Sequence, residues 1–97
     1  MIYHVTSRHN WEKALADGYY ANPSLEIEGF IHCSKLEQVE GVLHRYFTGQ
    51  KDLLLLHIEE KKLSSPLKIE WAPSVNEEFP HVFGPINFEA VIETSSI

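Results

Sequence analysis

Four consecutive leucines, Leu53–Leu56, constrain the fold of this chain more than any other feature. They lie in the segment Asp52–Glu59, which stays apolar up to His57. A continuous apolar run of this kind is typical of a β-strand that is buried on both faces. Four apolar residues are too few to span a bilayer. The sequence therefore predicts a central strand of a sheet, with both faces of that strand covered.

Shorter patterns predict two helices and five further strands around this central strand. One helix runs from a Ser7 cap to about Asp17, and the second begins at the capping box Ser34–Glu37 and ends at Thr48. The further strands are predicted at residues 2–6, 29–33, 67–71, 81–83 and 87–94, with connections at 19–28 and 73–80. Helices come early and most strands late. The sequence thus predicts one small α+β domain over residues 1–97, with two main helices packed on a bent mixed or antiparallel sheet.

The spacing of apolar residues also predicts which faces are buried. The second helix carries a stripe at spacings of three and four: Leu36, Val39, Val42, Leu43, Tyr46 and Phe47. Two strands alternate, so that each places three apolar side chains on one face: Leu67, Ile69 and Trp71 in the first, and Phe88, Ala90 and Ile92 in the second. We expect the helical stripe to pack on the sheet.

The balance of charges excludes one class of partner. Fourteen acidic and eight basic residues give a formal charge of −6, and Lys61-Lys62 is the one adjacent basic pair. Binding to a nucleic-acid backbone needs clustered Lys and Arg, so we expect no such binding. A small anionic ligand held by a local site remains open. The N-terminal residues do not resemble a signal peptide, and Cys33 is the single cysteine, so we expect a cytoplasmic protein that does not enter the membrane.

Three of the six histidines interrupt apolar strand patterns: His4, His32 and His81. In such a context an imidazole must find a hydrogen-bond partner. Two interpretations stay open, namely three separate structural hydrogen bonds or one shared cleft. We predict the shared cleft, because these histidines occur next to hydroxyl, glycine or proline positions where strands end. We further expect each imidazole to keep one nitrogen available for a ligand.

Glu70 is the carboxylate that we expect to find near this cleft. It lies on the strand face opposite Ile69 and Trp71, where it is either solvated or turned to the cleft. A carboxylate at the cleft could orient a ribose hydroxyl or stabilise developing positive charge. We place Ser34 at the edge of the cleft and Glu70 or Thr6 beside it.

Metal binding and cysteine chemistry are the weaker interpretations. The sequence has no spacing typical of zinc ligands, and His32 and Cys33 are adjacent, so they face opposite sides of a strand. We therefore expect no metal, which makes a metal-dependent hydrolase the weakest of the functions considered. We interpret Cys33 as a small buried residue of the core rather than as a nucleophile.

Five blocks of the sequence resemble the domain-of-unknown-function 952 family from end to end: Tyr3–Thr6, Gly29–Ser34, Tyr46–Leu56, Lys68–Trp71 and Phe79–Pro85. The fold of that family is similar to the ADP-ribosyltransferase-like fold. The resemblance implies that His4 bonds the ribose of NAD, that His32 and Ser34 lie near the nicotinamide, and that either Glu70 or His81 fills a late-strand position usually held by a glutamate.

The resemblance also implies a set of ligand-binding residues: His4, Thr6, Arg8 and Ser34, with Arg8 the candidate for phosphate. Two functions follow. The first is an ADP-ribosyltransferase-like enzyme that binds NAD or an ADP-ribosylated substrate and uses four catalytic residues: His4, His32, Glu70 and His81. The alternative is a non-catalytic module that binds a nucleotide or a peptide in the same cleft. A carboxylate that points into the cleft favours catalysis, and one that points outward favours binding alone.

Overall fold

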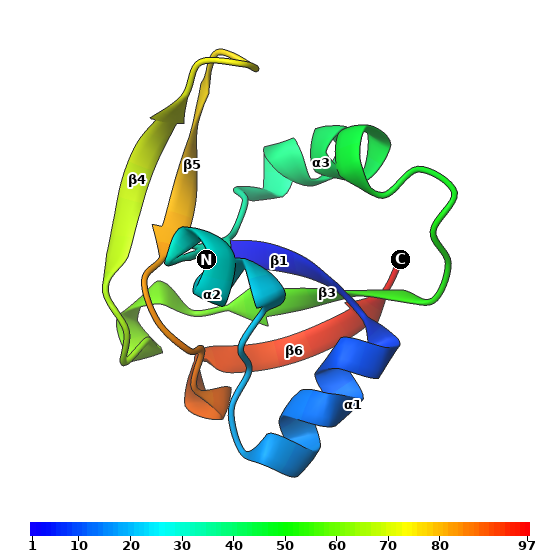
Figure 1. The fold of residues 1–97 in the computed structure, drawn as a ribbon, viewed down its shortest axis with the longest axis vertical. Helices are drawn as coiled ribbons and strands as arrows, with labels where there is room; N and C mark the ends of the chain where they lie inside the picture. The colour runs from blue at the N-terminus through cyan, green and yellow to red at the C-terminus, as the bar shows by residue number, and fades with distance from the viewer.

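Six strands form two antiparallel three-stranded sheets in the computed structural model, which covers residues 1–97 (Figure 1). The strands are β1 (Ile2–Ser7), β2 (Ile31–His32), β3 (Leu53–Ile58), β4 (Leu67–Ala72), β5 (Glu77–Val82) and β6 (Val91–Ser96). The first sheet has the order β1-β3-β6 and the second has the order β2-β5-β4. All pairings are antiparallel, so the α+β prediction is confirmed, while the single bent sheet is replaced by two sheets.

Three α-helices and three 3-10 helices connect these strands. The α-helices are α1 (Arg8–Asp17), α2 (Pro23–Glu28) and α3 (Val39–Tyr46). The 3-10 helices are η1 (Leu36–Gln38), η2 (Glu60–Lys62) and η3 (Phe88–Ala90). No helix combines the length and the apolar character that crossing a membrane requires.

The leucine run forms the middle strand of the first sheet, as predicted. β3 lies between β1 and β6, and its side chains alternate between two apolar clusters. Leu56 and Ile58 are fully buried in the larger cluster, which Ala14 of α1 joins. Leu53 and Leu55 belong to the smaller cluster under α3. Both faces of β3 are therefore covered, each by a different helix.

The two sheets are joined where the chain leaves β2. Tyr3 and Ser34 exchange two backbone hydrogen bonds, of 2.8 and 2.7 Å. The backbone N–H of Cys33 donates to the carbonyl of Pro80 in β5, at 3.0 Å. The segment after β2 thus pairs with a strand of each sheet, and this junction brings β1, β2 and β5 together.

The predicted connection at residues 19–28 contains the helix α2, so that prediction is wrong. The side chain of Asn22 accepts a hydrogen bond from the N–H of Ser24, Pro23 opens the helix, and Gly29 ends it at φ 87°. Asn at the cap, Pro in the first turn and Gly at the end are helix signals. A helix of only six residues is too short to show a clear apolar periodicity, so the Asn22-Pro23 pair indicates a turn when the sequence is taken alone.

The predicted capping box at Ser34–Glu37 does not form. Ser34 is buried in its bridge to Tyr3, and the cap lies one residue later, where Gln38 Oε1 accepts from the N–H of Lys35 at 2.9 Å.

The prediction that the apolar stripe of the second helix packs on the sheet is correct only in part. Four of its residues contact the smaller cluster, namely Val39, Val42, Leu43 and Phe47, but Leu36 and Tyr46 are about 60% exposed.

The predicted loop at residues 73–80 is also wrong, because β5 begins at Glu77 and makes a hairpin with β4. This hairpin projects from the body of the protein in Figure 1. Ile69 and Trp71 share a face, as predicted, but that face is half-exposed. The opposite face of the hairpin carries Glu70 together with the buried side chain of Phe79.

The last predicted strand begins too early. Residues 88–90 form the turn η3, and β6 begins at Val91. Ala90 is fully buried while Ile92 is half-exposed, so these two side chains do not lie on one buried face. The prediction that Cys33 is a core residue is confirmed, because only 2% of its surface is exposed.

Candidate functional site

A cleft of about 490 Å³ opens beside the junction of the two sheets. Its walls come from β1, α2, α3, the segment Ile31–Ser34 and the β4–β5 hairpin. Polar side chains line one part: His4, Asn22, Ser24, Glu28, His32, Ser34 and His81. Apolar side chains line the rest: Val5, Val42, Phe47, Val75 and Phe79 among them. The volume is within the range of small-molecule sites.

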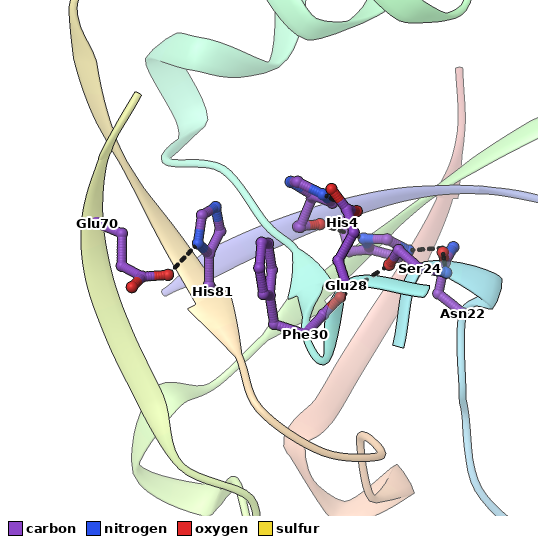
Figure 2. A network of polar contacts seen from close by, with 8 residues as sticks. His4, Asn22, Ser24, Glu28, Phe30, Glu70 and His81 are labelled. Carbon is purple, nitrogen blue, oxygen red and sulfur yellow. Dashed lines mark hydrogen bonds and ion pairs between the residues drawn. The ribbon is translucent and has the colours of Figure 1, made fainter. Parts of the chain in front are cut away.

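His81 is held in a fixed orientation at the β5 wall of this cleft. Its Nδ1 lies 2.7 Å from Oε1 of Glu70 on the neighbouring strand, so the Nδ1–H donates to the carboxylate. The ring of Phe30 stacks on the other side, with centroids 4.2 Å apart and planes at 18°. Figure 2 shows His81 between these two residues. Nε2 of His81 has no partner in the protein, which leaves it for a ligand.

His32 forms a second pair of the same kind. Its Nε2 lies 2.7 Å from Oε2 of Glu28, the last residue of α2. The His32 ring is 5.1 Å from that of His81, at 77°, and 4.8 Å from that of Phe30. Phe30 therefore contacts both imidazoles. Each histidine has one nitrogen bonded to a carboxylate and one nitrogen free.

His4 differs, because both of its nitrogens are bonded within the protein. Nδ1 lies 2.6 Å from the carbonyl oxygen of His32, and Nε2 lies 2.7 Å from the hydroxyl of Tyr20. A carbonyl only accepts, so Nδ1 carries the proton and Nε2 accepts from Tyr20. Burial lowers the pKa of His4 to about 4, which keeps the ring neutral at pH 7. The expectation of a free nitrogen is therefore wrong for His4.

The Tyr20 hydroxyl is the centre of a buried polar network. It lies 2.8 Å from Thr6 Oγ1 and 3.0 Å from Nδ2 of Asn22. Its single proton goes to His4, so Thr6 and Asn22 donate to the Tyr20 oxygen. Figure 2 shows Asn22 and Ser24 on the side of His4 away from His81. The network ties the start of α2 to β1, which fixes the helix that carries Glu28.

The structure brings most of the predicted residues together. His4, His32, His81 and Ser34 all line the cleft. Glu70 and His81, which the sequence presented as alternatives for one position, are partners in one hydrogen bond. The functional roles of these residues stay predictions.

Two predicted ligand residues are placed away from the cleft. Thr6 is buried and is not a wall residue, and its hydroxyl is connected to the wall residues His4 and Asn22 through the Tyr20 hydroxyl. Arg8 is not a wall residue; its guanidinium pairs with Asp52 at 2.8 Å. Arg8 follows a motif in the sequence but does not reach the cleft. The preceding strand β1 carries it to the beginning of β3, away from the cleft.

Sequence reasoning missed Glu28, Phe30, Asn22 and Tyr20. Glu28 could have been found, because it precedes His32 by four residues and follows the helix signal at Asn22. Tyr20 gave no signal in the sequence, because only the fold shows that its hydroxyl bonds to His4.

Burial raises the pKa of the Cys33 thiol, which agrees with its place in the core. No group of three or more His, Cys, Asp or Glu side chains is arranged to hold a metal ion.

Comparison with known proteins identifies relatives that share the fold. Residues 5–94 match the model of a family described as a protein of unknown function (DUF952). A crystal structure of protein CC0527 from Caulobacter crescentus is 32% identical, with a TM-score of 0.88 over 98% of this chain and 83% of that chain. A solution NMR structure of CC0527 gives 32% identity and a TM-score of 0.83, over 99% and 83% of the two chains. No curated protein matches the chain.

Proposed function

We propose a function from the geometry of the cleft, since the chain belongs to the DUF952 family, whose description states no function. The cleft binds a small nucleotide-like ligand, either NAD or an ADP-ribosylated substrate, on a fold of the ADP-ribosyltransferase-like kind. One observation carries this proposal. The rings of His32 and His81 lie 5.1 Å apart in one cleft, and each is oriented by a carboxylate that leaves its other nitrogen free.

The apolar walls supply the second part of a nucleotide site. Val42 of α3, Phe47 directly after α3 and Phe79 of β5 line the cleft together with the two histidines. A flat aromatic ring gains from contact with such a surface, while ribose hydroxyls need donors and acceptors close by. The cleft offers both within one cavity.

Catalysis in this cleft would use Glu28 rather than Glu70. Cleavage of a ribosyl–nitrogen bond develops positive charge on the ribose, which a nearby carboxylate stabilises. Glu28 lines the cleft, whereas Glu70 lies behind His81 and is bonded to it. In this arrangement His81 keeps Nε2 as a proton acceptor and His32 orients the Glu28 carboxylate.

A second candidate function is a binding module without catalysis. It is favoured by the position of Glu70, because the late-strand carboxylate orients a histidine and does not face the ligand. The two candidates require the same cleft and the same histidines. They differ in whether the ligand is recovered intact.

Ligand screening by thermal shift tests the proposal. A ligand at a hundred times its dissociation constant stabilises a protein by about 2.7 kcal/mol, which a melting curve resolves. We expect NAD, ADP-ribose or a related nucleotide to raise the Tm of the wild type, and the His81→Ala and His32→Ala variants to lose this effect. His44→Ala is the matched control, since His44 is exposed on α3 and is not a wall residue. Lack of stabilisation by any nucleotide or nucleoside would contradict the proposal.

The fate of a stabilising ligand then distinguishes the enzyme from the binding module. Incubation followed by chromatography shows whether the ligand is cleaved. Cleavage that is lost in Glu28→Gln, with binding retained, supports the enzyme. An intact ligand after prolonged incubation supports the binding module.

A further inference from the structure

The charges on the cleft wall restrict what part of a nucleotide can enter. Among the wall residues Glu28 is the only carboxylate, and there is no lysine or arginine. The two histidines with a free nitrogen, His32 and His81, are each already paired with a carboxylate. Each pair therefore carries no net positive charge even when its imidazole is protonated. The wall offers hydrogen bonds but no uncompensated cation.

The basic side chains outside the wall have other contacts. Lys68, the cross-strand neighbour of His81, places its Nζ 5.0 Å from the centroid of the Phe83 ring. Arg8 is bonded to Asp52. Lys35 follows the wall residue Ser34, but it faces a separate hollow that also contains three glutamates: Glu37, Glu77 and Glu78. Arg45 lies over the ring of Tyr46, 5.6 Å from its centroid, and is itself not a wall residue. A phosphate could meet a cation only at the rim, at Arg45 next to Tyr46 or at Lys68 beside His81.

Binding of a phosphate group inside this cleft would be energetically unfavourable. Moving a doubly charged group out of water is strongly unfavourable unless a cation or several donors replace its hydration. Here the incoming phosphate would instead meet the charge of Glu28, and like charges at short range repel. A neutral group has neither of these costs, and a positively charged group is attracted by Glu28 rather than repelled.

We infer that the cleft recognises a ribonucleoside, neutral or cationic, and that the phosphates of any nucleotide stay outside it. This inference rests on the proposed function and names its substrate class. The base lies against the apolar wall that Val42 and Phe47 form. The ribose hydroxyls donate to the Glu28 carboxylate and bond to the free nitrogens of His32 and His81.

Two matched series of ligands test this selectivity by titration calorimetry. The first is adenosine, AMP and ADP-ribose, and the second is nicotinamide riboside, its mononucleotide and NAD. We expect each nucleoside to bind as tightly as its phosphorylated forms or up to about tenfold more tightly. Tighter binding of the phosphorylated members by about tenfold or more would overturn the inference. Arg45→Gln then shows whether that cation holds the phosphate at the rim.

Two variants alter the charge of the wall in a defined way. Glu28→Gln removes the repelling charge, and Ser74→Lys places a cation on the hairpin turn that lines the cleft. We expect either change to shift the preference toward nucleotides by about fivefold or more. Ser64→Lys is the control, because Ser64 is exposed and outside the cleft. Unchanged preference in both variants would contradict the inference.

The outcomes separate this inference from the proposed function. If nucleotides bind and nucleosides do not, the selectivity is wrong and the nucleotide site stands. If no member of either series binds, both are wrong. If nucleosides bind at least as tightly as their phosphorylated forms and His81→Ala abolishes their binding, both are supported.

Discussion

Nδ1 of His81 and Oε1 of Glu70 are 2.7 Å apart, so two residues of neighbouring strands act as one unit. The diagonal position of Glu70 and His81 on one face of the β4–β5 hairpin makes this contact possible. A carboxylate at Nδ1 fixes both the tautomer and the orientation of an imidazole. Glu70 thus orients the His81 ring, and in the proposed site it would act on the ligand only through His81.

The tautomer of His81 is the first prediction. In the neutral His81 ring of the wild type, we expect the proton on Nδ1, because Glu70 accepts it. In Glu70→Ala this preference should be lost, and the ring should become a mixture of both tautomers. Nitrogen-15 NMR of the imidazole distinguishes the two forms. Glu40→Ala, an exposed change on α3, should leave the His81 signals unchanged. A fixed Nδ1–H tautomer in Glu70→Ala would show that Glu70 does not orient the ring.

The second prediction concerns the hydroxyl of Tyr20. Tyr20→Phe keeps the buried ring but leaves His4 Nε2, Thr6 and Asn22 without their shared partner. Buried polar groups that lose a partner cost about 1–3 kcal/mol, so we expect the free energy of unfolding to fall by about this amount. Urea denaturation measures it. The control is Tyr19→Phe, because the neighbouring Tyr19 is about half exposed and should change little. Equal stability of the two variants would mean that the network is not formed.

His4 makes the stability depend on pH in a definite direction. Its pKa is lowered from 6.5 to about 4 in the folded protein, so between these values the unfolded state binds more protons. Stability is therefore highest above pH 6.5 and falls as the pH drops toward 4. Between pH 7 and pH 5 we expect His4 to account for a loss of about 2 kcal/mol, because each pKa unit corresponds to about 1.36 kcal/mol.

The variant His4→Gln isolates this contribution. It removes the titrating ring, so its stability should be lower at pH 7 but less dependent on pH than that of the wild type. Urea denaturation at several pH values between 5 and 7 gives both slopes. Parallel slopes in the two proteins would show that His4 titrates normally in the folded state.

Two leucines that look alike in the sequence should respond very differently to truncation. Leu56 is fully buried between β1 and β6, whereas Leu36 in η1 is 61% exposed. We expect Leu56→Ala to lower the free energy of unfolding by about 2–5 kcal/mol. Leu36→Ala should lower it by less than about 0.5 kcal/mol, since exposed positions have small effects. Similar losses in both variants would contradict the burial described above.

Leu36 also shows where sequence reasoning stops. The spacing of apolar residues predicted α3 and its contact with the sheet, because periodicity reflects which side of a helix is buried. It could not show that the first turn begins at Lys35 and is 3-10, which places Leu36 outside the contact. The later start of the helix follows from the β-bridge between Ser34 and Tyr3, because a residue in this bridge cannot also cap the helix. The two residues are 31 positions apart in the sequence.

The candidate site, like α3, was predictable in part: the histidines could be identified from the sequence, but their hydrogen-bond partners could not. Interrupted apolar strands correctly identified His4, His32 and His81 as residues of one cleft. The bonding of each ring was not predictable, because it comes from side chains of other elements. His4 meets Tyr20 from the loop after α1, and His81 meets Glu70 across the hairpin. A sequence shows which residues need partners, and only the fold shows which partners they find.

The last prediction concerns Gln38, which holds two walls of the cleft together. Its side chain is buried between η1 and the hairpin. On one side, Oε1 accepts a hydrogen bond from the N–H of Lys35. On the other side, Nε2 donates to the carbonyl oxygen of Glu78 at 2.8 Å and to the Glu77 carboxylate at 3.0 Å. Gln38→Ala leaves the Lys35 N–H and the Glu78 carbonyl unpaired. We expect a loss of about 1–3 kcal/mol in urea denaturation.

Gln38→Glu tests the same contact with the shape preserved. The new carboxylate can still accept from Lys35, but it cannot donate to Glu78 and it repels Glu77. At pH 7 we therefore expect Gln38→Glu to be at least as unstable as Gln38→Ala, and to recover at low pH when its carboxyl is protonated and can donate. Glu37→Ala, an exposed neighbour, is the control. Because α3 and the hairpin form two walls of the cleft, ligand-induced stabilisation should weaken in both Gln38 variants and not in the control. A Gln38→Glu variant as stable as the wild type at pH 7 would mean that the hairpin is not anchored through this side chain.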